Sequence, residues 1–176
     1  VRITGDCPIV DPNLVDHCIE VFKKGDYDYL SNINPPSFPD GLDIEVMTYS
    51  ALKKAHTEAS SVFDKEHVTP FIRNKKIFKK KNIKNNKNFS DLRWTLDEAE
   101  DFKVIKGIFD HFYPNILFSW KEVLDLYNDN RNLFSENSCI KRNEGASMTN
   151  GTKLWNRAKK VIPGGNMLLS KRSEMF

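Results

Sequence analysis

The sequence predicts an α/β fold, because short β-branched segments alternate with segments of helical periodicity. Residues 1–4 are typical of a strand and lead into the turn-forming residues 5–8, with the letters GDCP. Asp11 then suits a helix N-cap and Pro12 the first helical position, and apolar residues recur at helical spacing until Gly25. The chain is therefore expected to begin with a strand–loop–helix unit.

A proline-rich loop separates the next two expected strands. Residues 26–30 alternate as a half-buried strand does, whereas residues 34–41 cannot be regular because their prolines remove donors and fix φ. One face of the strand after this loop carries Leu42, Ile44 and Val46. Asp43 and Glu45 share its other face, where they either point to solvent at a sheet edge or bind a ligand.

Helices and a polar segment are expected next along the chain. Ser50 is predicted to cap a helix over residues 51–59, and residues 65–73 are predicted to be helical with Pro70 near a turn. Residues 75–87 are rich in Lys and Asn, which predicts an exposed ribbon or loop. Its charges either form a solvated face or meet an anion.

A further strand and two helices complete the expected domain. Residues 91–96 are typical of a strand, and the four acidic residues within 97–101 suit the first turn of the following helix, where the macrodipole favours them. Ser119 and Glu122 form a capping box that opens a last helix.

Composition and length predict one folded domain with a tail. The 176 residues are 39% hydrophobic and 11% aromatic, as in a globular protein. Asn, Ser and Gly dominate late in the chain, so we expect a domain over residues 1–130 and a linker over residues 131–151. The chain begins with Val1 inside an expected strand, which suggests a fragment of a longer protein.

Charge and cysteine usage exclude some classes of function. Lys and Arg number 27 against 24 Asp and Glu, a surplus too small to imply nucleic acid. Three widely spaced cysteines without a CxxC pair fit reduced thiols, and hence a cytoplasmic setting. No apolar run approaches the roughly 18 residues of a membrane span.

Two aspartates are the strongest candidates for a metal site. Ligands of α/β sheets gather outside the carboxyl ends of the strands. Asp6 follows the first expected strand and Asp97 follows the one at residues 91–96, so both carboxylates are expected to face one crevice. Mg²⁺ takes one or two protein carboxylates and completes its shell with water and phosphate oxygens. Each aspartate alone also fits a turn or a helix cap.

Four segments, in order, resemble the spore coat polysaccharide cytidylyltransferases. They are RITGDCPIVDP at 2–12, FPDGLDIEV at 38–46, EHVTP at 66–70 and LRWTLD at 92–97. This family is similar to the CMP-sugar synthetases for Kdo and sialic acids. The resemblance implies a nucleotide-diphospho-sugar transferase (Rossmann-like) fold, with a mixed, mostly parallel sheet between helices. It covers the C-terminal part of that fold, so the fold is expected to be truncated at its N-terminus.

The resemblance also implies an activity and its residues. The reaction would move a cytidylyl group from CTP to a sugar and release pyrophosphate, for surface polysaccharide biosynthesis. Asp6 and Asp97 would be the catalytic residues that hold Mg²⁺. The sugar side would be lined by Asp40, Gly41, Asp43, Glu45 and His67, although His67 by itself fits a surface or core-rim histidine better than a catalytic base. The family's opening strand and basic glycine-containing loop are missing, so this fragment is expected to be inactive alone.

Alternatives and further expectations remain open at this point. A non-catalytic domain of the same fold could bind a glycan or a protein partner, and a related transferase could use another nucleotide. A homodimer is compatible with either function. Residues 152–176 resemble the start of a class III aminotransferase of the glutamate-1-semialdehyde aminomutase type, which implies pyridoxal phosphate only in a downstream domain.

Overall fold

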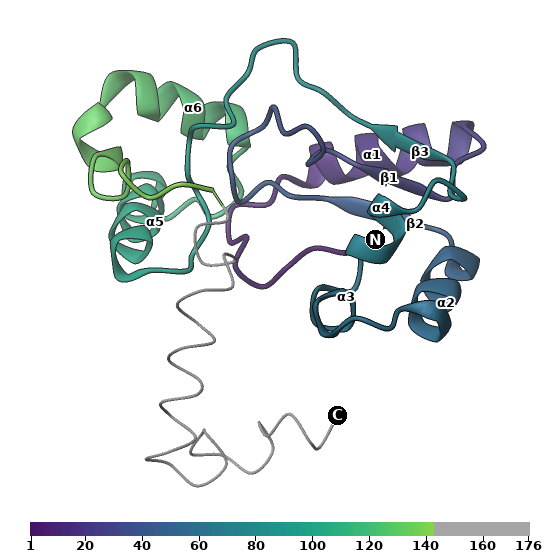
Figure 1. Ribbon diagram of the computed structural model, residues 1–176. Coiled ribbons are helices and arrows are strands. Elements are labelled where there is room, and N and C mark those ends of the chain that lie inside the picture. The colour runs from purple at the N-terminus through teal and green to yellow at the C-terminus, as the bar shows by residue number, and fades with distance from the viewer. Residues whose placement is uncertain (143–176) are drawn as a thin grey trace, which may run out of the picture. The chain divides into compact units, whose positions relative to one another are not determined.

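A three-stranded mixed sheet lies within the compact unit Val1–Cys139 (Figure 1). Its strands are β1 (Tyr29–Ser31), β2 (Glu45–Met47) and β3 (Lys80–Asn82), in the order β2-β1-β3. β1 pairs antiparallel with β2 and parallel with β3. The structure is a computed structural model that describes residues 1–142, so the aminotransferase-like segment expected at residues 152–176 lies outside the described residues.

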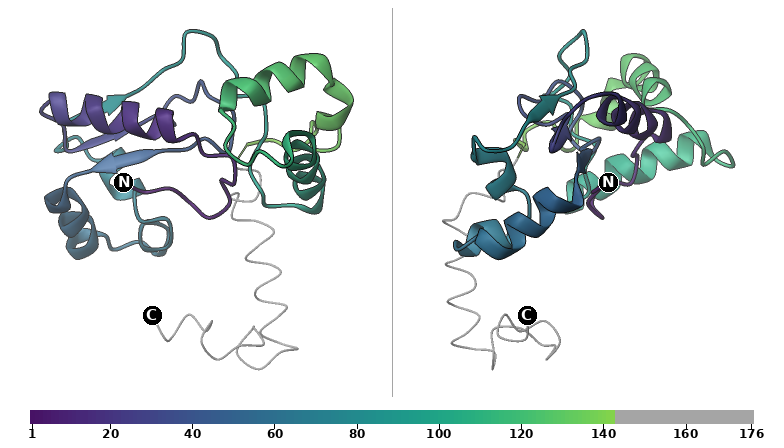
Figure 2. Two further views of the ribbon diagram at one scale, coloured as in Figure 1. Left: turned by 180° about the vertical axis from the view of Figure 1, so that it is seen from behind. Right: turned by 90° about the vertical axis from the view of Figure 1, so that its right-hand side faces the viewer.

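Helices pack against both faces of this sheet, which confirms the predicted α/β class (Figures 1 and 2). α1 (Pro12–Lys24) packs on one face, where Leu30 of β1 belongs to the same buried cluster as Cys18. On the other face, Tyr29 shares a second buried cluster with side chains of α2 (Tyr49–Glu58) and α4 (Pro70–Asn74). Because successive strand residues point to opposite faces, Tyr29 and Leu30 connect the sheet to different layers.

The remaining helices lie beyond the sheet. α3 (Val62–His67) precedes α4. α5 (Ala99–Phe112) and α6 (Trp120–Asp129) lie side by side in all three views (Figures 1 and 2). Buried apolar residues of α5 and α6 join the cluster under α1, so one core extends from the sheet to these helices.

The predicted helix starts are confirmed at both ends of the unit. Asp11 caps α1 by accepting the backbone N–H groups of Asn13 and Leu14. Ser119 and Glu122 form the capping box of α6. The predicted cap at Ser50 is wrong, because Thr48 accepts the Ala51 N–H and begins α2 two residues earlier.

Four segments differ from their predicted secondary structure. Residues 1–4 and 91–96 are not regular strands and contribute only isolated bridges, Arg2 to Glu45 and Asp40 to Arg93. The expected helix over residues 65–73 is divided between α3 and α4 by Val68, whose φ is 67°. The polar segment 75–87 contains β3, because its backbone pairs with β1.

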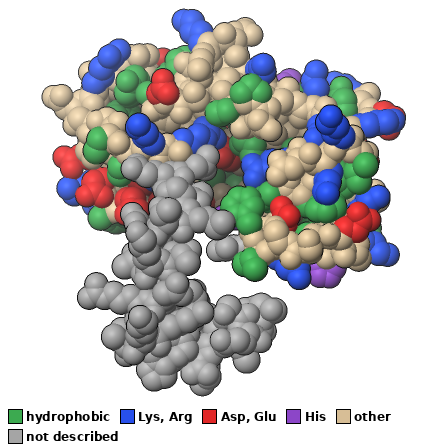
Figure 3. Space-filling view, viewed as in Figure 1, with side chains coloured by type: hydrophobic (Ala, Val, Ile, Leu, Met, Phe, Trp, Pro, Cys, Tyr) green, Lys and Arg blue, Asp and Glu red, His purple; other side chains and the backbone are tan. Residues whose placement is uncertain are grey.

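Residues 131–139, expected to begin a linker, pack into the compact unit. A 3₁₀ helix, η1 (Arg131–Phe134), follows α6 and buries Phe134. Asn137 is also buried and bonds back to the domain. None of the helices among residues 1–142 is long and apolar enough to cross a bilayer. Basic and acidic side chains are interspersed over the face shown in Figure 3.

Candidate active site

The backbone brings the two predicted metal ligands to one place. The carbonyl oxygen of Asp6 accepts the Leu96 N–H at 2.9 Å and the Thr95 hydroxyl at 3.0 Å. Thr95 Oγ1 also lies 3.5 Å from Asp97 Oδ2. Loop 5–8 is therefore hydrogen-bonded to the segment that carries Asp97. Neither aspartate directly follows a regular strand.

Arg93 organises the carboxylates beside this junction. Its side chain is 7% exposed, and it donates to Asp97 Oδ2 from Nη2 at 3.1 Å and to Asp40 Oδ2 from Nη1 at 3.3 Å. Asp101 accepts from Nε at 2.8 Å and from Nη2 at 2.7 Å, a bidentate geometry. One buried cation thus fixes three acidic side chains from two loops and from α5.

Asp101 is the buried anchor of this group. Burial alone would raise the pKa of its carboxyl, but hydrogen bonds from Arg93, from the Asn137 amide and from the Glu98 and Asp97 N–H groups outweigh it. The pKa consequently falls from 3.8 to about 2. Asp101 stays charged at neutral pH and holds both Arg93 and the first turn of α5.

Asp97 is held by Arg93 and is also exposed to solvent. Its side chain is 48% exposed, and among the described residues no hydrogen bond reaches its Oδ1. Asp6 is half-buried, and its Oδ1 accepts only a weak 3.7 Å contact from the Cys7 thiol. Each carboxylate therefore has an oxygen available for a ligand.

Two of the residues predicted for the sugar side lie near these aspartates. The backbone N–H of Asp43 bonds to the Cys7 thiol, and burial, followed by the charges of Asp6 and Asp43, raises the pKa of that thiol to about 11 despite a Thr4 hydrogen bond. Asp40 is 8% exposed and is held by Arg93. Asp43 thus borders the Asp6 loop, whereas Asp40 supports the site from below the surface.

Gly41 has a structural role that the prediction did not include. Its φ of 98° favours glycine, and a Cβ at this position would lie 2.5 Å from the Trp94 carbonyl. The same close approach allows the Trp94 N–H to bond to the Asp40 carbonyl at 2.7 Å. Gly41 therefore permits the contact that seats Asp40 beside Arg93.

Glu45 and His67 have contact partners different from those of the four aspartates. Glu45 is only 2% exposed and is bonded by Arg2 and by the Tyr29 hydroxyl, so it is not on a solvent-facing side. His67 ends α3, with its ring centroid 4.4 Å from that of Phe63. The structure thus brings together Asp6, Asp97, Asp40 and Asp43, and leaves Glu45 and His67 in other environments.

The donor set near Asp6 and Asp97 fits a magnesium ion that is shared with a substrate. Among residues 1–142, no group of three or more His, Cys, Asp or Glu side chains could hold a metal by protein ligands alone. Mg²⁺ does not need such a cage, since it keeps several waters and uses one or two carboxylates together with phosphate oxygens.

Comparison with known proteins identifies the family of this fold. The family model for cytidylyltransferases matches residues 1–138. The chain belongs to the cytidylyltransferase family. A solved cytidylyltransferase from Leptospira borgpetersenii serovar Hardjo-bovis superposes with a TM-score of 0.72 at 27% identity, over 80% of this chain and 60% of that chain.

Two curated relatives have sequences similar to the same part of the chain. The spore coat polysaccharide biosynthesis protein SpsF of Bacillus subtilis is 31% identical over 142 residues, which cover 77% of this chain and 57% of SpsF. The uncharacterized protein MJ1063 of Methanocaldococcus jannaschii is 32% identical over 145 residues, which cover 81% of this chain and 58% of that protein. The chain therefore spans less than two thirds of the length of these relatives.

Sequence reasoning missed Arg93, Asp101 and Asn137. Arg93 and Asp97 are four residues apart, a spacing that signals an ion pair only within a helix. Asn137 bonds to the Arg93 carbonyl at 3.1 Å and to Asp101 Oδ1 at 2.8 Å, across 44 and 36 residues. Such long-range contacts leave no local pattern in the sequence.

Proposed function

We propose that this chain carries the metal-binding side of a nucleotidyltransferase that moves a cytidylyl group from CTP to a sugar and releases pyrophosphate. The observation that carries the proposal is the attachment of the Asp6 carbonyl to Thr95 and Leu96, which gathers two ligand-accessible aspartates in a member of the cytidylyltransferase family. A role in surface polysaccharide biosynthesis is supported by the name of the relative SpsF.

In this proposal Asp6 and Asp97 hold Mg²⁺. The ion would offset the negative charge of the nucleotide phosphates during transfer. Arg93 holds Asp97 by its Oδ2, which leaves Oδ1 available for the ion. Asp101 and Asn137 keep Arg93 in place, so the geometry of the exposed aspartate depends on a buried network.

The test is pyrophosphate release by the gene product that contains this chain, assayed with CTP and a panel of acidic and neutral sugars. Release should require both Mg²⁺ and a sugar. Asp6→Asn and Asp97→Asn should each lower kcat by about a hundredfold or more, because each removes a charge that stabilises the transition state through the metal. Asp16→Asn, on the exposed face of α1, is the matched control and should have no effect.

Two results would contradict the proposal. Turnover within about threefold of wild type in both site variants would remove these aspartates from the metal site. Absence of release with every sugar and nucleotide, in a folded protein, would favour a non-catalytic glycan- or partner-binding domain, whereas release from UTP or GTP alone would identify a transferase of another nucleotide.

A further inference from the structure

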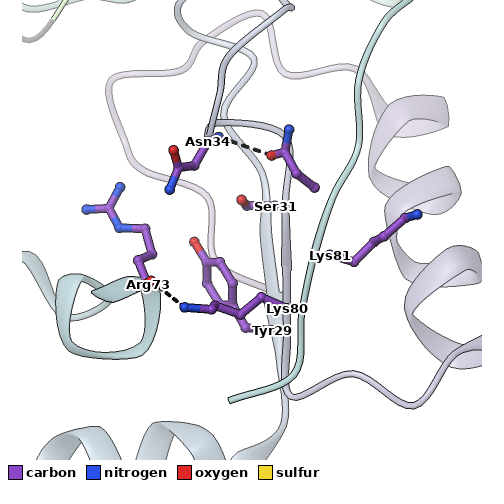
Figure 4. A pocket seen from close by; sticks show the side chains of 7 residues that line it. Tyr29, Ser31, Asn34, Arg73, Lys80 and Lys81 are labelled. Atoms are coloured by element: carbon purple, nitrogen blue, oxygen red, sulfur yellow. Dashed lines mark hydrogen bonds between the residues drawn. The ribbon is translucent and has the colours of Figure 1, made fainter. Parts of the chain in front are cut away.

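A cavity of about 560 Å³ lies between the start of α1, the start of α6 and residues 83–86 after β3. Leu14 and Ile83 form part of its lining, and both belong to the buried cluster under α1. Figure 4 shows the Lys81 amine pointing away from a smaller cavity on the opposite face of the sheet. Ile83 follows Lys81 by two residues, so its side chain also points away from that face. The larger cavity therefore lies on the α1 side of the sheet.

The larger cavity is separate from the candidate metal site. Its lining includes none of the four aspartates gathered there, Asp6, Asp40, Asp43 and Asp97. The acidic residue in its lining is Asp11, which is 2% exposed. The Asp11 carboxylate accepts three backbone N–H groups at the starts of α1 and α6. It is therefore committed to the fold, and it has little capacity left to bind a cation in the cavity.

Trp120 contributes a buried hydrogen-bond donor to the cavity wall. It is 8% exposed, and the Phe38 and Phe89 rings contact it in T-shaped geometry, with centroids 5.6 Å and 6.2 Å from its own. Its backbone N–H is accepted by Asp11, but within residues 1–142 no oxygen or nitrogen atom accepts its indole N–H. Buried tryptophans normally have a partner for this group. The wall thus requires an acceptor atom that the described side chains do not supply.

Two lysines at the rim of the cavity have free ammonium groups. Lys84 follows β3 and Lys121 is the second residue of α6; both are exposed, and neither forms an ion pair with any described residue. Lys80, in the smaller cavity, is different, because its Nζ donates to the carbonyl oxygens of Arg73 and Lys75 (Figure 4). The Lys84 and Lys121 ammonium groups are therefore available to an anion.

The start of α6 adds a backbone donor to the same wall. The Trp120 N–H is accepted by Asp11 and the Glu122 N–H by Ser119. The Lys121 N–H between them has no acceptor in the described part of the chain. The first N–H groups of a helix favour negative charge. The cavity consequently presents an indole N–H, a backbone N–H and two ammonium groups.

These donors fit a phosphate group that is attached to a small organic molecule. Lysine binds phosphate as a point charge and helix N-termini also bind phosphate, whereas a planar carboxylate favours the arginine fork. Arginine is not among the residues that line the cavity. The remaining lining is suited to the organic part of the ligand, because it combines apolar side chains with asparagine amides that can bond to hydroxyl or carbonyl groups.

The size of the cavity agrees with such a ligand. Its volume lies within the about 300–1,000 Å³ of small-molecule pockets, which admits a sugar phosphate or a nucleoside monophosphate. We infer that this cavity is a second ligand site, which binds a phosphorylated small molecule outside the metal site through Lys84, Lys121 and the Trp120 indole. The inference does not depend on the proposed nucleotidyl transfer, because its residues are not those of the metal site.

Calorimetric titration of the gene product that contains this chain tests the inference. The probes are ribose 5-phosphate, CMP and UMP, each compared with ribose, cytidine or uridine, in EDTA so that no Mg²⁺ occupies the Asp6 and Asp97 site. At least one phosphorylated probe should bind about tenfold or more tightly than its counterpart, because only the phosphate bonds to the ammonium groups. The affinity should fall as salt rises, since both lysines are exposed. Tighter binding of CMP and UMP than of ribose 5-phosphate identifies a nucleoside phosphate, and the reverse order identifies a sugar phosphate.

Variants locate the bound phosphate. Lys84→Gln and Lys121→Gln should each weaken binding about three- to tenfold, and the double variant should lose the preference for the phosphorylated probe. Trp120→Phe keeps an aromatic ring but removes the N–H, so it should weaken binding about threefold or more. Lys23→Gln is the matched control, since Lys23 is exposed near the end of α1 and does not line the cavity. Thermal unfolding of each variant verifies that the fold persists.

Three outcomes would overturn the inference. Equal affinity for every phosphorylated probe and its counterpart would show that the protein recognises no phosphate without Mg²⁺. Unchanged affinity in the folded double lysine variant would place the phosphate elsewhere. Binding that is lost in Asp6→Asn but retained in the double lysine variant would assign the probe to the metal site, and the proposed nucleotidyl transfer would stand without a second ligand site.

Discussion

At the scale of single residues, Asp101 shows how one buried carboxylate supports an exposed site. It is 0% exposed and accepts hydrogen bonds from Arg93, Asn137 and the backbone at the start of α5. Removing a partner from such a cluster leaves a charge buried without compensation, which is more costly than losing a surface ion pair. The orientation of Asp97 should therefore be sensitive to a residue that touches no ligand.

Asp101→Asn should lower the free energy of unfolding by about 3 kcal/mol at pH 7, because Arg93 loses its bidentate partner. The folded pKa of Asp101 lies below its unfolded value of 3.8, at about 2, so its stabilisation is complete above pH 4 and is lost as pH falls toward 2. That shift corresponds to about 2 kcal/mol. Urea unfolding between pH 7 and pH 2 measures both quantities.

Asp91→Asn provides the control, because Asp91 is exposed and outside the cluster. Its stability should follow the wild type at every pH. The difference between wild type and Asp101→Asn should shrink as the pH approaches 2. A difference that stays constant over this range would mean that the charge of Asp101 contributes nothing to stability.

The residues of the site were predictable only where a local rule applied. Asp6 and Asp97 were inferred from their places after expected strands, and the structure gathers their loops by backbone bonds even though those strands are reduced to bridges. Arg93 carried no such signal. Its importance depends on which groups surround it, and a partner 53 residues away, Asp40, cannot be read from spacing.

At the scale of elements, Asp11 joins two helices that begin 108 residues apart in the chain. Its Oδ1 accepts the first N–H groups of α1, and its Oδ2 accepts the Trp120 N–H at the start of α6, at 2.9 Å. The side chain is almost fully buried. One carboxylate thus satisfies donors at two helix N-termini, where negative charge is favoured.

Asp11→Ala should cost about 2–4 kcal/mol of unfolding free energy, the sum of a lost N-cap and a buried N–H left without an acceptor. Ser119→Ala is the comparison, because it removes an exposed cap from α6 alone and should cost about 1 kcal/mol. Chemical denaturation of both variants gives the two values. Equal costs would show that the Trp120 bond contributes no stability of its own.

Helices were more predictable than strands for a physical reason. Capping residues such as Asp11 and Ser119 act within four residues, so their pattern is visible in the sequence. β3 is Lys80–Asn82, a polar stretch whose strand conformation comes from pairing with β1. Its partner lies about 50 residues away, so local composition indicated a ribbon or loop instead.

At the scale of the whole compact unit, the chain after α6 completes the core. Phe134 of η1 is 6% exposed, and its ring centroid lies 5.3 Å from that of Tyr127 and 6.4 Å from that of Trp94. Trp94 lies between Arg93 and Thr95, in the segment that holds Asp97 and the Asp6 carbonyl. Residues 131–139 therefore stabilise the site in two ways. Phe134 packs near Trp94, and Asn137 bonds to Arg93 and Asp101.

Phe134→Ala should consequently destabilise the unit by about 3–5 kcal/mol, since it opens a cavity beside a fully buried tryptophan. Ser138→Ala, an exposed change in the same segment, should stay within about 0.5 kcal/mol of wild type. Urea denaturation followed by tryptophan fluorescence measures both, because Trp94 reports on the contact directly. If residues 131–139 were only a linker, Phe134→Ala would resemble the serine control, and the support of the Asp97 segment would have to come from α5 alone.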